Sequence, residues 1–184
     1  MPIASPDNVL KSVRAALCLA LWGAPAWSAT LELLSLNDLI SKSTTIVQAQ
    51  VAASSAAFTG SSIYTHYTVN VVAQWKGPSQ STIDVMVPGG TAKGMRQICP
   101  GVPQLVTGQQ YVLFLWKSSR GQTYTMGFTQ GVFNLLGTAG NLTAAQMPST
   151  ETVLAPATGL AVQSQPISMS LSQLISAITT GGTT

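Results

Sequence analysis

The amino-acid sequence predicts an all-β domain of about five to seven strands, with a short helix before it and an amphipathic helix after it. Between residues 46 and 147, segments rich in β-branched and aromatic residues alternate with Gly- and Pro-containing turns. One run, Tyr111–Trp116, is apolar at every position and predicts a central strand buried on both faces. Near the C-terminus, apolar residues between Leu171 and Ile178 follow the helical period.

The first helix is expected at residues 35–40, because Ser35 and Asp38 have the spacing of a capping box. Four strands are expected at Ile46–Val51, Ile63–Trp75, Thr82–Val87 and Tyr111–Trp116, and weaker ones near Tyr124–Met126, Val132–Leu136 and Leu142–Met147. In the segment 63–75, apolar and polar residues alternate, which predicts one buried and one solvated face.

The N-terminus has the pattern of a cleavable signal peptide. Lys11 and Arg14 precede the apolar run Ala15–Gly23, and cleavage after Ser28 would leave small residues at the required positions. The run has about half of the roughly 20 residues that a spanning helix needs, which favours a leader over a membrane anchor. We therefore expect a periplasmic or secreted protein without an integral membrane segment after cleavage.

The expected organisation has four parts. They are a signal peptide (1–28), a β-barrel domain with its N-terminal helix (29–147), a Pro- and Thr-rich connection (148–166), and a C-terminal helix and tail (167–184). A chain of 184 residues suits one domain with a substantial core.

Composition argues against several classes of function. Only 7% of the residues are charged, and after leader removal six basic residues face four acidic ones. Such a small surplus without clustering argues against nucleic-acid binding. Leader removal also leaves Cys99 as the only cysteine, so no internal disulfide is expected, and we interpret Cys99 as a semi-buried apolar residue.

Catalytic side chains are scarce. His66 is the only histidine, and Asp84 is the acid in the neighbouring strand that could complete a Ser-His-Asp triad with a serine. No G-x-S-x-G motif is present. A zinc site would need three or four Cys, His or acidic ligands, and the sequence offers too few. We therefore expect no catalytic residues, metal or cofactor.

The best candidate binding site is a glycine-rich loop with a positive edge. It comprises Pro88, Gly89, Gly90, Lys93 and Arg96. Glycines allow a partner to approach the backbone closely, although a wide turn would use the same residues. Two tryptophans are interpreted as packing residues rather than as stacking surfaces for a ligand: Trp75 and Trp116.

An ordered set of motifs covers a little over half of the chain. It contains Ile46, Val47 and Val51; Trp75, Lys76 and Gly77; Val85, Val87, Pro88, Gly89 and Gly90; Gly94 and Gln97; Gly101 and Pro103; and Gly108 with Tyr111–Leu115. This combination resembles a group of exported bacterial proteins of unassigned function. The long strand, the K-G turn and the G-x-x-Y strand are also distantly similar to netrin-like or TIMP-like modules.

The second resemblance implies an OB-like small β-barrel. In the inhibitors of that group an N-terminal cysteine supplies the zinc-binding amine and carbonyl. The processed chain would begin at or near Ala29 and has no such cysteine, so the resemblance implies the fold and not that inhibitory mechanism.

We therefore expect an exported, non-catalytic module that binds a protein, a peptide or a glycan. The alternative is a hydrolase with an active site that includes His66. An outer-membrane barrel is disfavoured because the segment Tyr111–Trp116 does not alternate between apolar and polar residues.

Overall fold

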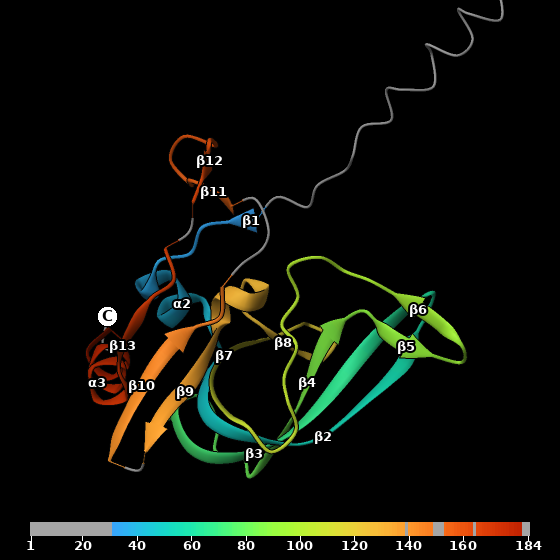
Figure 1. Ribbon diagram of the computed structural model, residues 1–184, viewed down its shortest axis with the longest axis horizontal. Coiled ribbons are helices and arrows are strands. Elements are labelled where there is room, and N and C mark those ends of the chain that lie inside the picture. Colours follow the sequence, from blue (N-terminus) through green and yellow to red (C-terminus); the bar gives the residue numbers. More distant parts are fainter. Residues whose placement is uncertain (1–30, 139, 149–152, 164, 182–184) are drawn as a thin grey trace, which may run out of the picture.

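The computed structural model describes residues 31–138, 140–148, 153–163 and 165–181 (Figure 1). The predicted leader and the last three residues of the predicted tail lie outside this range. The described chain is mostly β-structure with two α-helices, as the sequence predicted. Among the described residues, no helix is both long and apolar enough to cross a membrane.

Eight strands form the main sheet. They are β2 (Thr45–Thr59), β3 (Ser62–Lys76), β4 (Thr82–Pro88), β7 (Gln110–Lys117), β8 (Thr123–Thr125), β9 (Val132–Thr138), β10 (Asn141–Gln146) and β13 (Ser168–Ser170). Their order is β13-β10-β9-β7-β2-β3-β4-β8. Strand β8 is parallel to β4 and also pairs antiparallel with β7. Hydrogen-bonded pairing therefore runs from β7 through β2, β3, β4 and β8 back to β7.

Smaller elements lie around this sheet. A hairpin, β5 (Gly90–Ala92) with β6 (Met95–Gln97), follows β4, while β1 (Leu31–Glu32), β11 (Val153–Leu154) and β12 (Ala161–Val162) form a three-stranded sheet. The helices are α2 (Leu36–Lys42), α3 (Leu171–Gly181) and the 3-10 helix η1 (Phe128–Gly131). In Figure 1, α2 and α3 lie on the side of the molecule where β9 and β10 extend the sheet, away from the β5–β6 hairpin.

Two hydrophobic cores share strand β7. Tyr111, Leu113 and Leu115 point into one core, which β2, β3 and β4 complete. Val112 and Phe114 point into the other core, together with residues of β9, β10, α2 and α3. All five residues are 3% exposed or less, which confirms the prediction of burial on both faces for Tyr111–Leu115, whereas Trp116, the last residue of the predicted run, is 38% exposed.

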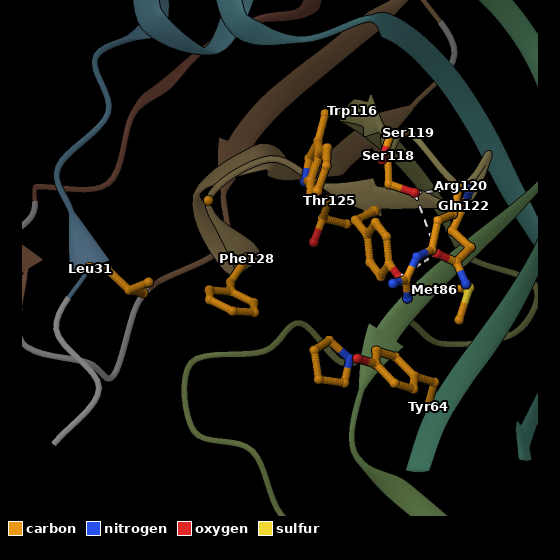
Figure 2. Close-up of a pocket in the computed structure, with 13 residues that line it drawn as sticks. Leu31, Tyr64, Met86, Trp116, Ser118, Ser119, Arg120, Gln122, Thr125 and Phe128 are labelled. Atoms are coloured by element: carbon orange, nitrogen blue, oxygen red, sulfur yellow. Dashed lines mark hydrogen bonds between the residues drawn. The ribbon is translucent and has the colours of Figure 1, made fainter. Parts of the chain in front are cut away.

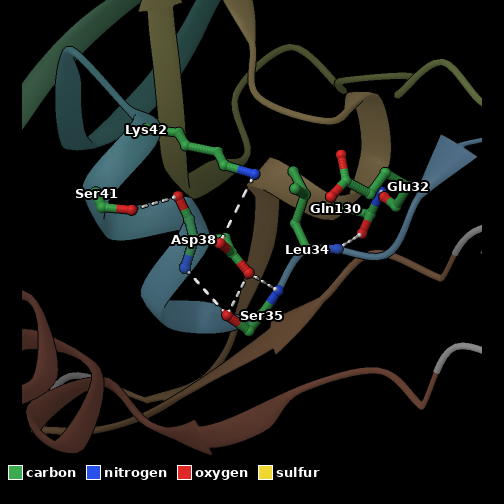
Figure 3. Close-up of polar contacts among 7 residues, drawn as sticks. All are labelled: Glu32, Leu34, Ser35, Asp38, Ser41, Lys42 and Gln130. Atoms are coloured by element: carbon green, nitrogen blue, oxygen red, sulfur yellow. Dashed lines mark hydrogen bonds and ion pairs between the residues drawn. The ribbon is translucent and has the colours of Figure 1, made fainter. Parts of the chain in front are cut away.

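Helix α2 begins and ends on specific polar contacts. Ser35 Oγ accepts a hydrogen bond from Asp38 N, and Asp38 Oδ2 accepts one from Ser35 N, which confirms the capping box (Figure 3). Hydrogen bonds from the Ser35 hydroxyl and backbone lower the pKa of the Asp38 carboxyl. At the other end, Lys76 Nζ donates to the carbonyl oxygens of Ile40 (2.6 Å) and Ser41 (3.2 Å). The lysine thus binds α2 to the end of β3.

Two buried glutamines connect segments that are distant in the sequence. Gln130, 2% exposed, accepts a hydrogen bond from Leu34 N at its Oε1 and donates from Nε2 to Glu32 O (Figure 3). Gln146 donates from Nε2 to Gln130 O and accepts from Ile167 N at its Oε1. Through these bonds, η1 and β10 hold the N-terminal segment and the segment before α3.

One strand is longer than the sequence analysis predicted. The strand expected to end at Val51 continues to Thr59 as β2 and pairs along its whole length with β3. The added part, residues 52–59, begins with six Ala and Ser residues, which have weak strand propensity, and ends with Phe58 and Thr59. Pairing with the strongly β-forming β3 therefore determines its conformation, and a tight turn around Gly60, at φ +63°, joins the two strands.

Replacing Gln130 by Ala should lower the free energy of unfolding by about 2–4 kcal/mol, because the buried Leu34 N–H and the Glu32 carbonyl would lose their partner. Urea denaturation of the variant and the parent chain measures the change. Gln109→Ala removes an exposed carboxamide and should stay within about 0.5 kcal/mol of the parent. A loss for Gln130→Ala as small as that of the control would contradict the structural role.

Candidate functional site: an aromatic pocket beside β7 and β8

Four aromatic side chains surround a pocket of about 650 Å³: Tyr64, Trp116, Tyr124 and Phe128. We call it the aromatic pocket. Figure 2 shows Tyr64, Trp116 and Phe128 around a common space, with Leu31 from β1 at the edge. Its volume lies in the range of about 300–1,000 Å³ that is typical of ligand sites. Apolar atoms of Met86 and Pro88 complete the wall.

Strand register brings these rings together. Trp116 on β7 lies directly opposite Tyr124 on β8, and Tyr124 also lies opposite Met86 on β4. Tyr64 on β3 lies opposite Pro88, at the end of β4. Side chains directly opposite on adjacent strands point to the same face, so segments far apart in the sequence place their side chains on one side of the sheet.

The rings form walls that face one another at different angles. Trp116 stacks on Tyr124, with centroids 5.2 Å apart and an interplanar angle of 26°. Tyr64 meets Tyr124 edge-on, at 6.3 Å and 62°. Trp116 is nevertheless 38% exposed, whereas its neighbour Leu115 is fully buried. An exposed indole beside two phenols gives a partner a large amphipathic contact surface.

Backbone strain accompanies the position of Phe128. Gly127 and Phe128 both have φ +58°, the left-handed region that residues with a Cβ rarely adopt. A Cβ on Gly127 would come within 2.7 Å of Leu34 Cδ1, so a larger residue there would need the Leu34 side chain to move. A bulky residue held in this region costs on the order of 1–3 kcal/mol, and such strain concentrates at ligand-binding and active sites.

The polar part of the pocket is the turn between β7 and β8. Ser118 N donates to Gln122 O, and Gln122 N donates to Ser118 Oγ, which closes the turn. The Tyr124 hydroxyl donates to Gln122 Oε1 at 3.3 Å. Arg120, at the tip of the turn, is the only charged residue among the described residues that line the pocket.

The surroundings of the Tyr124 phenol in the pocket shift its pKa. Burial raises its pKa, the neighbouring Tyr64 raises it further, and the positive charge of Arg120 lowers it. Arg120 is itself exposed.

The loop predicted from the sequence lies mainly on a second pocket, of about 350 Å³. Pro88, Gly89, Gly90 and Arg96 line it, and Pro88 also lines the aromatic pocket. Lys93 does not line this pocket; its Nζ lies 6.0 Å from the centre of the Phe58 ring.

The two glycines of the loop have a packing role. Gly89 N donates to Ile63 O, and Gly89 O accepts from Thr65 Oγ1. A Cβ on Gly90 would come within 2.6 Å of that same hydroxyl. The close approach of β5 to β3 therefore accounts for Gly90, at φ +132°. A Cβ on Gly89, at φ +94°, would lie 3.0 Å from the carbonyl oxygen of Gln97 in β6.

His66 and Asp84 form a pair on the solvated face of β3 and β4. His66 Nδ1 lies 2.8 Å from Asp84 Oδ2, and the two side chains are 27% and 54% exposed. Ser55 on β2 lies directly opposite His66 in the strand register. The acid and base that the sequence suggested for a triad are therefore in contact, in a position open to water.

Potential metal ligands do not cluster within the described part of the chain. No group of three or more His, Cys, Asp or Glu residues there could hold a metal ion. Cys99 is a free, half-buried cysteine beside the second pocket.

The aromatic pocket was missed by the sequence interpretation, which treated Trp116 as a packing residue. Trp75 is half-buried and packs against the second core, as interpreted. Trp116 extends beyond the buried part of β7 and lines the pocket instead. The aromatic pocket could have been identified by pairing two of the expected strands, one of which ends at Trp116 and the other of which begins at Tyr124.

Comparison of the sequence with protein-family models and with curated proteins finds no match. The assignment of a site therefore depends on geometry and chemistry alone. On that basis the aromatic pocket combines volume, one exposed and three half-buried aromatic rings, backbone strain and a cation in one place.

Replacing Arg120 by Gln should raise the pKa of the Tyr124 phenol further above its ordinary value, because the charge that favours the phenolate is removed. The difference in phenolate absorbance between chains with Tyr124 and with Tyr124→Phe isolates this titration. In the parent chain the folded pKa exceeds the unfolded value of about 10, so the related stability is present below that pH and is lost as the pH rises through the folded pKa. An unchanged Tyr124 titration in Arg120→Gln would show that the guanidinium does not act on the pocket.

Proposed function

We propose that this chain is an exported, non-catalytic binding module that holds a protein, peptide or glycan partner in the aromatic pocket. The observation that carries the proposal is the exposed Trp116, stacked on Tyr124 inside a pocket of ligand-binding size. Trp, Tyr and Arg dominate the binding energy of many interfaces, and all three are present here. The low fraction of charged residues and the leader-like N-terminus support export.

We also propose that the five strands β2, β3, β4, β7 and β8 form an OB-like barrel of the netrin-like or TIMP-like type. The cyclic order of their pairing and the parallel β4–β8 pair support this proposal. One hydrophobic cluster draws its residues from β2, β3, β4 and β7, as the interior of such a barrel would.

The loop predicted from the sequence remains a second possible contact surface of the same module. Pro88 lines both pockets, so a partner larger than a small molecule could contact Arg96 as well as the rings. The aromatic pocket is preferred because packing already explains Gly89 and Gly90.

Affinity capture from envelope and secreted fractions should give one saturable partner with the parent chain and none with Trp116→Ala, because truncation removes the largest contact surface of the pocket. Leu136→Ala is the matched control, since it shortens a large apolar side chain that is 56% exposed on β9. Direct titration of the purified partner then measures the affinity for each variant.

Three results would count against the proposal or change it. A partner retained by Trp116→Ala but lost with Arg96→Ala would move the site to the loop. Equal loss with Leu136→Ala would indicate an unspecific apolar contact. Capture of no partner by the parent chain would argue against a binding module.

A hydrolase is the second candidate function, favoured by the 2.8 Å contact between His66 and Asp84. His66 would act as general base, Asp84 would orient it, and Ser55 in the opposite register position would be the nucleophile. The exposure of Asp84 disfavours this function, because in the Ser-His-Asp triad the aspartate that orients the histidine is buried.

If the hydrolase is real, Ser55→Ala and His66→Ala should each lower the rate of p-nitrophenyl acetate hydrolysis by at least about a hundredfold. Ser54→Ala changes the adjacent serine, which lies opposite Tyr67 rather than His66, and should leave the rate unchanged. If the enzyme function is absent, all variants will match the slow rate of the parent chain.

A further inference from the structure

Arg120 provides a positive charge that no described carboxylate neutralises. The ion pairs within the described residues join Lys42 to Asp38 and His66 to Asp84, and neither includes Arg120. No acidic residue belongs to the described lining of the aromatic pocket. The pocket is therefore complementary to a ligand with one negative charge and an apolar body.

The ring geometry favours an inserted side chain over a stacked sugar. Sugar rings are commonly held against an open, flat aromatic face. Here Trp116 covers one face of Tyr124, and Tyr64 approaches the same ring edge-on. These three rings therefore contact one another and form one aromatic wall. Phe128 lines the same pocket of about 650 Å³, a volume that admits the side chain of a large apolar residue.

Three polar groups at the rim bond to one another. The Gln122 carboxamide oxygen accepts from the Tyr124 hydroxyl and lies 3.4 Å from Ser118 Oγ. A glycan needs several free donors and acceptors, whereas a carboxylate needs one strong donor group. The guanidinium of Arg120 is such a group and matches a carboxylate in geometry.

From these observations we propose that the aromatic pocket binds the carboxyl-terminal end of a peptide. The apolar side chain of the last residue lies among Tyr64, Trp116 and Phe128, and the terminal carboxylate accepts hydrogen bonds from Arg120. This inference rests on the proposed binding function and specifies its partner. It also gives the turn between β7 and β8 a role in specificity, because the turn carries both Arg120 and the serines at the rim.

Two tripeptides that differ only at their ends test the proposal: acetyl-Ala-Ala-Phe with a free carboxylate, and the same peptide as its carboxamide. The full chain is labelled with 5-fluorotryptophan, and Trp116→Phe identifies the fluorine resonance of Trp116. Both peptides should shift that resonance, because both insert the phenyl ring, while the Trp75 resonance should stay in place. The free acid should bind about tenfold more tightly, because only it makes charged hydrogen bonds.

Arg120→Gln should abolish the difference between the acid and the amide without preventing the shift. Lys42→Gln removes a positive charge from helix α2, outside the pocket, and should leave the difference unchanged. Added salt should weaken binding of the acid more than binding of the amide.

Equal affinities for acid and amide in the parent chain would overturn the carboxylate inference and leave the pocket as an apolar binding site. A shift with N,N′-diacetylchitobiose and none with either peptide would overturn the peptide inference in favour of a glycan. If none of these probes shifts the Trp116 resonance, the inference also fails, while affinity capture with Trp116→Ala decides the binding function separately.

Discussion

The burial of β7 on both faces is the constraint on which the other parts of the molecule depend. Because successive residues of a strand point to opposite sides, the run from Tyr111 to Leu115 supplies two cores at once. One core needs β2, β3 and β4 against it, and the other needs β9, β10 and both helices. The same constraint determines where the aromatic pocket lies, because Trp116 is the first residue at which β7 extends beyond the cores. Its indole continues the face of Val112 and Phe114, but it meets Tyr124 and solvent instead of a helix.

Polar groups inside the molecule then determine how the peripheral segments attach. A carboxamide has both donors and an acceptor, so Gln130 can satisfy two backbone groups of the N-terminal segment that would otherwise be buried without a partner. Gln146 bonds one backbone group of the segment before α3, Ile167 N, and one in η1, Gln130 O. This arrangement bears on the aromatic pocket, because Leu31 lies just before the anchored residues and lines the pocket's edge. A change at Gln130 would therefore alter the pocket indirectly, and binding data on such variants need a stability measurement beside them.

Prediction from sequence succeeded where one residue pattern has one structural solution. The capping box at Ser35, the alternation in β3 and the continuous apolar run of β7 each correspond to an observed element. Prediction failed where pairing between distant segments determines the local structure. The Ala- and Ser-rich half of β2 has no strand signal of its own and follows its partner β3. The sequence analysis missed the aromatic pocket for the same reason. Tyr64, Trp116 and Tyr124 are ordinary strand residues in the sequence, and only the register of three strand pairs places them together. The loop from Pro88 to Arg96 drew attention because its glycines are conspicuous, and packing accounts for Gly89 and Gly90.

The recognisable motifs of the chain are explained by folding rather than by function. In the W-K-G motif, Lys76 binds the last carbonyls of α2, and a Cβ on Gly77 would come within 2.6 Å of Thr44 O. In the G-x-x-Y motif, the Tyr111 hydroxyl accepts a hydrogen bond from Val106 N and so fixes the approach to β7. Motifs of this kind identify an architecture, and proteins that share an architecture can bind unrelated partners. The residues that would distinguish one partner from another lie between the motifs, on the turn that carries Arg120 and at the strand ends that carry the rings. Specificity in this chain is therefore expected to vary with the β7–β8 turn while the two cores stay the same.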